Sequence, residues 1–411
     1  MNAVVMEPLR EDWADVESHL DKLVARGAVA EAQDHARDFH QRLCAVRVLG
    51  PACGSGNFLY VALELLKQLE GEVLERLEGL GGQEGFALAG ETVDPSQLLG
   101  IEVHPRAAAI AELVVWIGYL RWQIANGGLH AIPEPVPGAR GAIECRDAVL
   151  AWDETSPRMD ADGAPVTAWD RTATVISPTT GAPVPDPSAR VQAMDHLSAR
   201  RASWPEAEFV VCNPPFIGDK DLRAELGDGY VEALWTARPE VPPSADFVMQ
   251  WWDEAARRTV AKGGVPRRFG FITTNSITQT FSRRVVERHL RAKRPLSLTS
   301  AVSDHPWVKS TGRAAVRIAM TVAGTRPGLL GRVASEAGLD TDAPVVRLRR
   351  TRMTITAKLT VGADVTAAAS LLSNEGVSSP GVKLHGAAFI VTPARSGSGA
   401  SRGWRRTSAP T

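Results

Sequence analysis

Arg47-Val48-Leu49-Gly50-Pro51-Ala52-Cys53-Gly54-Ser55-Gly56-Asn57-Phe58-Leu59 reads as a short apolar strand, a turn with two glycines, and the start of an amphipathic helix. Apolar residues recur at helical spacing from Phe58 to Val73. Glycines at such a turn let backbone amides approach a ligand closely, and the helix N-terminus favours a carboxylate. The third glycine of the nicotinamide-binding fingerprint is absent, and a Gly-x-Gly turn alone is more often structural than functional.

Two further predicted strands end beside acidic residues. The segment 98–103 places Glu102 at its end, where a carboxylate could accept hydrogen bonds from ribose hydroxyls. The segment 142–148 places Asp147 near its end, where it suits an adenine amino group. An isolated carboxylate at a strand end is usually a helix cap or a solvated turn. Because ligands collect at the carboxyl ends of strands in an open α/β sheet, we expect these loops to share one crevice.

A fourth apolar run, Phe209 to Val211, leads into the loop 212–218, which contains Asn213, Pro214, Pro215 and Phe216. An exocyclic amine on a base is a poor nucleophile, because its lone pair is delocalised into the ring. The Asn213 side chain and the Pro214 carbonyl could accept its two N–H bonds in a turn that prolines make rigid. Phe216 could stack on a flipped base. The simpler interpretation is a proline-rich turn after a buried strand.

The order of these motifs resembles that of the S-adenosylmethionine-dependent DNA adenine-N6 methyltransferases, and more closely that of the MmeI-like methylases. The family string Asp-Pro-Ala-Cys-Gly-Ser-Gly-Asn-Phe-Leu-Tyr is similar to residues 50–60, and Asn-Pro-Pro-Phe-Ile-Gly matches residues 213–218. Residues 268–277 are similar to the same methylases, in which modification and restriction belong to one polypeptide. The resemblance extends from about Glu7 to Pro393.

The resemblance implies a Rossmann-like class I methyltransferase fold, with a mostly parallel seven-stranded sheet and helices on both faces. It also implies roles for individual residues. The methionine part of S-adenosylmethionine would be wrapped by Pro51, Ala52, Cys53, Gly54 and Gly56. Its ribose and adenine would be bound by Glu102 and Asp147, and the target adenine would be held by Asn213, Pro214, Pro215 and Phe216. The family has an acidic residue where this chain has Gly50, which predicts weaker cofactor binding.

The expected function is site-specific methyl transfer to the N6 amino group of adenine in double-stranded DNA, within a restriction-modification or phage-defence system. Cytosine-N4 transfer uses the same amine chemistry and stays open. Cytosine-C5 transfer needs a nucleophilic cysteine in a Pro-Cys loop, whereas Cys53 lies in the glycine turn. The alternatives are a methyltransferase for RNA or protein glutamine, and a catalytically inactive remnant that binds DNA or cofactor.

Composition sets broad limits on the protein. With 411 residues and 44% hydrophobic residues, the chain can bury a large core. The four cysteines, Cys44, Cys53, Cys145 and Cys212, lack metal-type spacing, which indicates reduced thiols and no metal site. Because no apolar run approaches membrane-spanning length and the N-terminus does not read as a secretory signal, we expect a cytoplasmic protein without a membrane partner.

The net charge of −1 says little about nucleic-acid binding, for which a local basic face is expected. Two clusters are candidates, although a solvated surface is the commoner explanation for each. One predicted helix carries Arg283, Arg284, Arg288, Arg291, Lys293 and Arg294. One predicted strand carries Arg347, Arg349, Arg350 and Arg352, of which Arg347 and Arg349 share a face that could follow phosphates.

The chain divides into predicted segments. Residues 1–44 form a helical segment, and residues 45–330 form a catalytic domain with an insertion at 153–205 that includes a hairpin near 174–184. Within that domain we expect a helix at 105–126, a strand at 269–274 and a closing antiparallel pair at 298–303 and 315–323, with Asp304 to Trp307 as a loop between them. Residues 331–393 form a β-containing extension, and residues 394–411 a disordered tail. The chain reads as a core fragment without the family's nuclease and target-recognition domains, so a separate domain or subunit is expected to supply specificity.

Overall fold

A mixed sheet is the centre of the computed structural model, which describes residues 1–81, 92–127, 142–170, 172–179, 181–307, 316–324, 328–337 and 345–362. These residues belong to one compact unit, Met1–Gly362. The predicted tail at 394–411 and residues 363–393 of the predicted extension lie outside the described residues.

Within the described residues the central sheet has nine strands, in the order β17-β16-β14-β15-β13-β12-β1-β2-β3. The strands are β1 (Val48–Gly50), β2 (Leu98–Glu102), β3 (Ile143–Cys145), β12 (Phe209–Cys212), β13 (Arg268–Thr274), β14 (Ser297–Pro306), β15 (Arg317–Gly324), β16 (Leu329–Ala337) and β17 (Val345–Arg352). The strands from β3 to β13 are parallel, and β15 lies antiparallel between β13 and β14. The expectation of a class I methyltransferase sheet is confirmed for these seven strands. The strand number is corrected to nine, because β16 pairs with the free edge of β14 and β17 with β16.

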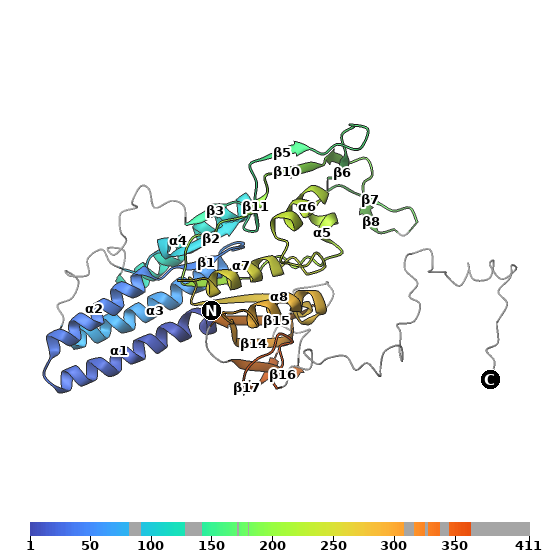
Figure 1. Cartoon of the computed structure of the whole chain (residues 1–411). Coiled ribbons are helices and arrows are strands. Elements are labelled where there is room, and N and C mark those ends of the chain that lie inside the picture. Colours follow the sequence, from blue (N-terminus) through green and yellow to red (C-terminus); the bar gives the residue numbers. More distant parts are fainter. Residues whose placement is uncertain are drawn as a thin grey trace, which may run out of the picture. The chain divides into compact units, whose positions relative to one another are not determined.

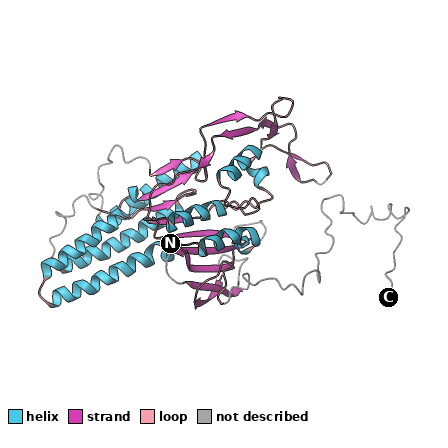
Figure 2. Cartoon of the chain, viewed as in Figure 1, coloured by secondary structure: helices cyan, strands magenta, loops and turns pink. Residues whose placement is uncertain are grey.

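Helices cover both faces of the sheet (Figures 1 and 2). One face packs against η1 (Asn2–Met6), α1 (Glu7–Ala25), α2 (Val29–Ala45), α3 (Asn57–Gly79) and α4 (Pro105–Gly127). The other packs against α6 (Asp228–Ala237), α7 (Met249–Val260) and α8 (Thr280–Leu290), and the short α5 (Leu222–Leu226) precedes α6. Successive residues of a strand point to opposite faces, so Phe209 and Val211 enter the first core and Val210 the second.

The insertion after β3 consists of short two-stranded ribbons. β4 (Leu150–Ala151) pairs with β11 (Arg200–Arg201), and β5 (Glu154–Pro157) pairs with β10 (Met194–Leu197). Farther out, β6 (Thr167–Trp169) pairs with β9 (Arg190–Gln192), and β7 (Thr174–Ile176) pairs with β8 (Pro183–Pro185). The last pair confirms the predicted hairpin, and Figure 1 shows these ribbons beside α5 and α6.

Two predictions about local structure are wrong. Asp304, His305 and Pro306 do not form a loop, because β14 continues through them to Pro306. The strand passes this polar segment by means of a bulge between Val302 and His305, at which Asp304 adopts a φ of 55°. The predicted arginine-rich helix ends at Leu290, so Lys293 and Arg294 lie beyond it.

The expectation that no apolar run approaches membrane-spanning length is also wrong. Among the described residues, the segment Pro105–Asn126 of α4 has the length and the apolar composition of a spanning helix, although most of its apolar stretch is not buried. The core helix of a soluble protein passes the same test, and α4 packs on α3, β2 and β3. Its outer surface exposes Ile110, Leu113, Ile117 and Ile124.

Candidate active site

The turn after β1 is held from the neighbouring strand. The Cys53 amide donates to the Ile101 carbonyl at 3.1 Å, and the Gly54 amide donates to Glu102 Oε2 at 2.9 Å. Gly56, with a φ of +83°, passes so close to α4 that a Cβ on it would lie 2.9 Å from the Ala111 Cα. The turn therefore needs glycine at this position, and Glu102 fixes its shape.

The loop after β12 lies beside this turn. The Cys212 thiol donates to the Ala52 carbonyl at 3.6 Å, so the two predicted site segments are in contact. Behind the turn, the Trp251 indole N–H donates to the Pro51 carbonyl at 2.7 Å. The sheet thus brings together residues that are far apart in the sequence at the carboxyl ends of β1 and β12.

Asn213 presents an acceptor without a partner. Its Oδ1 atom is buried and accepts no hydrogen bond from any described residue. Pro214 is buried, Pro215 is exposed, and Phe216 is 37% exposed. The Phe247 amide donates to the Ile217 carbonyl at 3.0 Å and holds the end of the loop against the segment before α7. The loop therefore offers a free amide oxygen and an aromatic face.

Trp307 is a residue of this site whose position the sequence did not predict. Its ring lies 6.5 Å from the Phe216 ring in an edge-to-face arrangement, and the residue is 41% exposed. It follows the last residue of β14, and its amide donates to the Val316 carbonyl at 2.9 Å. The string Asp304 to Trp307 stood out in the sequence. No signal in the sequence predicted the bulge in β14, after which Trp307 lies beside Phe216.

Asp147 follows β3 and has both carboxylate oxygens in hydrogen bonds. Oδ1 accepts from the amides of Val149 at 2.6 Å and Leu150 at 3.0 Å. Oδ2 accepts from the Tyr230 hydroxyl at 2.7 Å. Burial, and then the nearby Asp147 carboxylate, raise the pKa of Tyr230 well above its usual value, so this hydroxyl stays protonated and donates. A ligand amine at Asp147 must share Oδ2 with the Tyr230 hydroxyl. No local sequence motif predicted that Tyr230 would be the partner of Asp147.

A cluster of possible metal ligands lies elsewhere, between α2 and α3. The ligand atoms of His40, Cys44 and Glu70 lie within 4.8 Å of one another. Glu70 is already bound by the Lys67 ammonium at 2.6 Å from Oε2, and the Val93 amide donates to Oε1 at 2.8 Å. Because a cation already neutralises this carboxylate, we interpret the cluster as part of the helix packing.

Comparisons with known proteins show the family of the chain. The family model described as MmeI, DNA-methyltransferase domain, matches residues 27–327. DNA methyltransferase A of Bacillus subtilis (strain 168) is 23% identical over 242 residues, which are 58% of this chain and 22% of that protein. The chain thus spans about a fifth of this relative.

Two solved structures are among the matches. The Type IIL restriction-modification enzyme MmeI in complex with DNA has a TM-score of 0.55 and 20% identity, and the match covers 86% of this chain and 41% of that one. A modification subunit of a putative type I restriction enzyme from Vibrio vulnificus YJ016 has a TM-score of 0.37 and 16% identity, with 84% of this chain and 55% of that one covered. The likeness to MmeI supports the class I methyltransferase architecture.

Proposed function

Because the chain belongs to the family of MmeI DNA-methyltransferase domains, we propose that it transfers a methyl group to the N6 amino group of adenine in double-stranded DNA. We place this activity in a restriction-modification system. The observation that carries the proposal is the buried Asn213 Oδ1, which accepts no hydrogen bond from a described residue. An unsatisfied buried acceptor costs about 1–3 kcal/mol, and an incoming amine N–H would remove that cost.

The loop can do more than bind the amine. Together, Asn213 Oδ1 and the Pro214 carbonyl would accept both N–H bonds of the amino group. This favours a tetrahedral nitrogen whose lone pair points away from the two acceptors. Phe216, with Trp307 beside it, gives a flipped base an aromatic surface on which to stack. The chain's own residues thus supply orientation and electrostatic support.

The residues present also fit S-adenosylmethionine, which would supply a methyl group on a sulfonium centre. The first turn of α3 has no side-chain cap, so its amides can receive the methionine carboxylate above the glycine turn. Glu102 lies at the end of β2, directly against that turn, where ribose hydroxyls could donate to it. Asp147 Oδ2 would accept from the adenine amine together with Tyr230.

The test is methyl incorporation from labelled S-adenosylmethionine into duplex DNA by the natural chain and by Asn213→Ala. Loss of one of the two acceptors is expected to lower kcat about 10²- to 10³-fold, by analogy with a lost oxyanion-hole donor. Cofactor binding, measured by calorimetric titration, should be unchanged, because Asn213 belongs to the base side of the site. Asn126→Ala, at the exposed end of α4, is the matched control and should keep full activity.

Parallel reactions separate the competing functions. RNA and protein are offered under the same conditions, and the methylated base in DNA is identified after digestion to nucleosides. Label in N6-methyladenine supports the proposal, whereas label in N4-methylcytosine, RNA or glutamine contradicts it. Cofactor binding without transfer to any substrate would favour the catalytically inactive remnant.

A further inference from the structure

The ribbon formed by β16 and β17 brings like charges together. Arg332 on β16 lies directly opposite Arg349 on β17, and Arg347 lies two residues from Arg349 on the same face. Like charges at facing positions of an antiparallel pair are destabilising. No ion pair joins these three arginines to a carboxylate among the described residues, and all three are exposed. A bound anion would relieve this repulsion.

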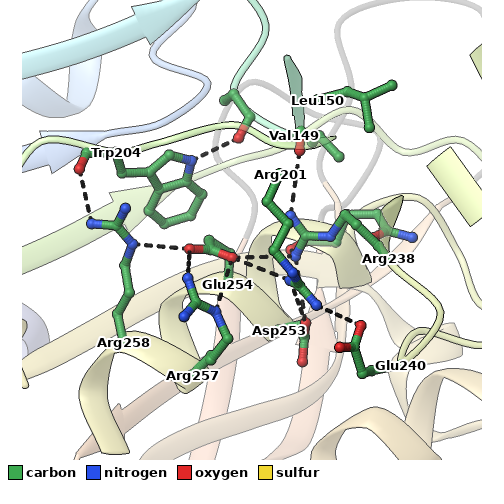
Figure 3. Close-up of polar contacts among 12 residues, drawn as sticks. Val149, Leu150, Arg201, Trp204, Arg238, Glu240, Asp253, Glu254, Arg257 and Arg258 are labelled. Atoms are coloured by element: carbon green, nitrogen blue, oxygen red, sulfur yellow. Dashed lines mark hydrogen bonds and ion pairs between the residues drawn. The ribbon is translucent and has the colours of Figure 1, made fainter. Parts of the chain in front are cut away.

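Many arginines elsewhere in the described fold are paired with acids. Figure 3 shows Arg201, Arg238, Arg257 and Arg258 gathered around the carboxylates in the middle of α7. Two of the three arginines of α8 are paired in the same way. Arg283 pairs with Glu287 at 2.9 Å, and Arg288 pairs with Asp253. The structure therefore separates the two basic clusters of the sequence, because key arginines of α8 hold the fold and those of the ribbon do not.

The ribbon lies at the same edge of the sheet as the candidate active site. β16 runs parallel to β14 with Arg332 opposite Ser303, near the end of β14 that leads to Trp307. Beyond Arg332, Ser335 of β16 faces Arg347. Because β16 runs in the direction of β14, Arg332 and the residues that follow it approach the carboxyl edge of the sheet. Arg349 and Arg347 face Arg332 and Ser335, so they lie toward the same edge.

A chain of polar contacts ties the ribbon to that edge. Asn275, directly after β13, donates to Asp304 Oδ1 at 3.3 Å, and Arg317 Nε donates to the same oxygen at 2.7 Å. Arg317 also pairs with Glu336 of β16 at 2.7 Å. These contacts connect β13, β14, β15 and β16 in sequence, so the ribbon is fixed relative to the strand ends that carry the loop with Asn213.

We propose that Arg332, Arg347 and Arg349 bind backbone phosphates of the DNA duplex beside the flipped base. This rests on the proposed function for the identity of the polyanion. The arginines lie on the same face of the sheet as the buried Leu330, which packs into the core beneath α7 and α8. Arg332, Arg347 and Arg349 therefore form an exposed basic strip on this face, next to Leu330, the last residue of β16 in the hydrophobic core. Phosphate contacts carry no sequence information, so the strip positions the duplex and does not choose the site.

The test is the salt dependence of duplex binding by the full chain, measured by fluorescence anisotropy. The double variant Arg347→Ser, Arg349→Ser removes two phosphate contacts, so the slope of log K against log salt concentration should become shallower by about 1.8. The matched control is Lys293→Ser, Arg294→Ser, which removes two exposed cations near the amino end of β14, at the opposite edge of the sheet. Its slope should equal that of the natural chain.

Two further measurements make the result decisive. The melting temperature of the ribbon variant should be no lower than that of the natural chain, because the variant relieves the repulsion between Arg332 and Arg349. Titration with S-adenosylmethionine should be unchanged, and its failure in the natural chain would count against the proposed function alone. An unchanged salt slope in the ribbon variant, or no duplex binding by the natural chain, would overturn the role of the ribbon.

Discussion

Gly50 stands where the family has an acidic residue, and its surroundings explain why a small residue fits there. It pairs with Gly100 across β1 and β2. A Cβ on Gly50 would lie 3.1 Å from the Cys53 Cβ, and one on Gly100 would lie 2.9 Å from the Cys53 Sγ. The two glycines thus leave the space that the Cys53 side chain fills. Burial, with a smaller contribution from Glu102, raises the pKa of this thiol to about 12, so Cys53 acts as a neutral packing residue.

Gly50→Asp is therefore expected to lower the free energy of unfolding by about 1–3 kcal/mol, because the new side chain overpacks the region around Cys53. Urea denaturation measures the change. Gly71→Asp serves as the control, since a Cβ on Gly71 meets nothing within 4 Å. Equal stability of Gly50→Asp and the natural chain would show that Cys53 moves aside freely. Cofactor titration of the folded variant then tests whether the carboxylate strengthens binding.

At the scale of elements, a buried ion pair joins three helices. The Lys67 ammonium on α3 lies 2.6 Å from Glu70 Oε2 and 4.2 Å from the centre of the Trp122 ring on α4. His40 of α2 lies 3.3 Å from Glu70 Oε1. Burial alone would raise the pKa of Glu70, but the contacts with His40 and Lys67 outweigh it and hold the pKa below its usual value. The carboxylate therefore stays charged between the helices.

Lys67→Met should destabilise the protein by about 3–5 kcal/mol, because it leaves a buried carboxylate unpaired. The double variant Lys67→Met, Glu70→Met should cost less than the single one, since no unpaired charge remains. Thermal and urea unfolding of both variants provide the comparison, with the exposed Lys22→Met as the control. A double variant that is less stable than Lys67→Met would contradict this account.

Across the whole molecule, Asp253 and Glu254 of α7 connect distant segments (Figure 3). Arg201 comes from the insertion, Arg238 follows α6, and Arg288 comes from α8. Burial would raise the pKa of Asp253, but its hydrogen bond with His289 and the charges of Arg288 and Arg238 lower it to about 2. The insertion is thus anchored to α7 beside the central sheet by charge, in addition to its short ribbons.

The depressed pKa of Asp253 predicts acid sensitivity. Its contribution, about 2 kcal/mol, is present above the ordinary carboxyl pKa and is lost as the pH falls from about 4 toward 2. Urea midpoints between pH 2 and pH 6 should therefore fall more steeply for the natural chain than for Asp253→Asn. If that variant does not fold, Arg288→Gln should move the acid loss to higher pH. The exposed Asp219→Asn should follow the natural curve, and a natural curve no steeper than the variant's would refute the assignment.

Local sequence was enough for much of the fold and for the loops of the candidate site. The strand, glycine turn and helix at 47–79, the carboxylates Glu102 and Asp147, and the loop with Asn213 lie where local patterns placed them. Periodicity, turn glycines and prolines act over a few residues, so they can be read without knowledge of the fold. The roles proposed for these residues in binding and catalysis stay predictions.

The sequence by itself determined the class of sheet, the order of its loops and the chemistry that the loops offer. Only the tertiary structure decided which distant groups meet. It placed Trp307 beside Phe216 and gave Asp147 a hydrogen bond from Tyr230. It also paired Arg283 and Arg288 of α8 with acids, whereas Arg347 and Arg349 of β17 have no acidic partner among the described residues. The physical reason is the distance along the chain over which each kind of interaction acts. Propensity and patterning act between near neighbours in the chain, whereas strand pairing and ion pairing depend on which surfaces folding brings together.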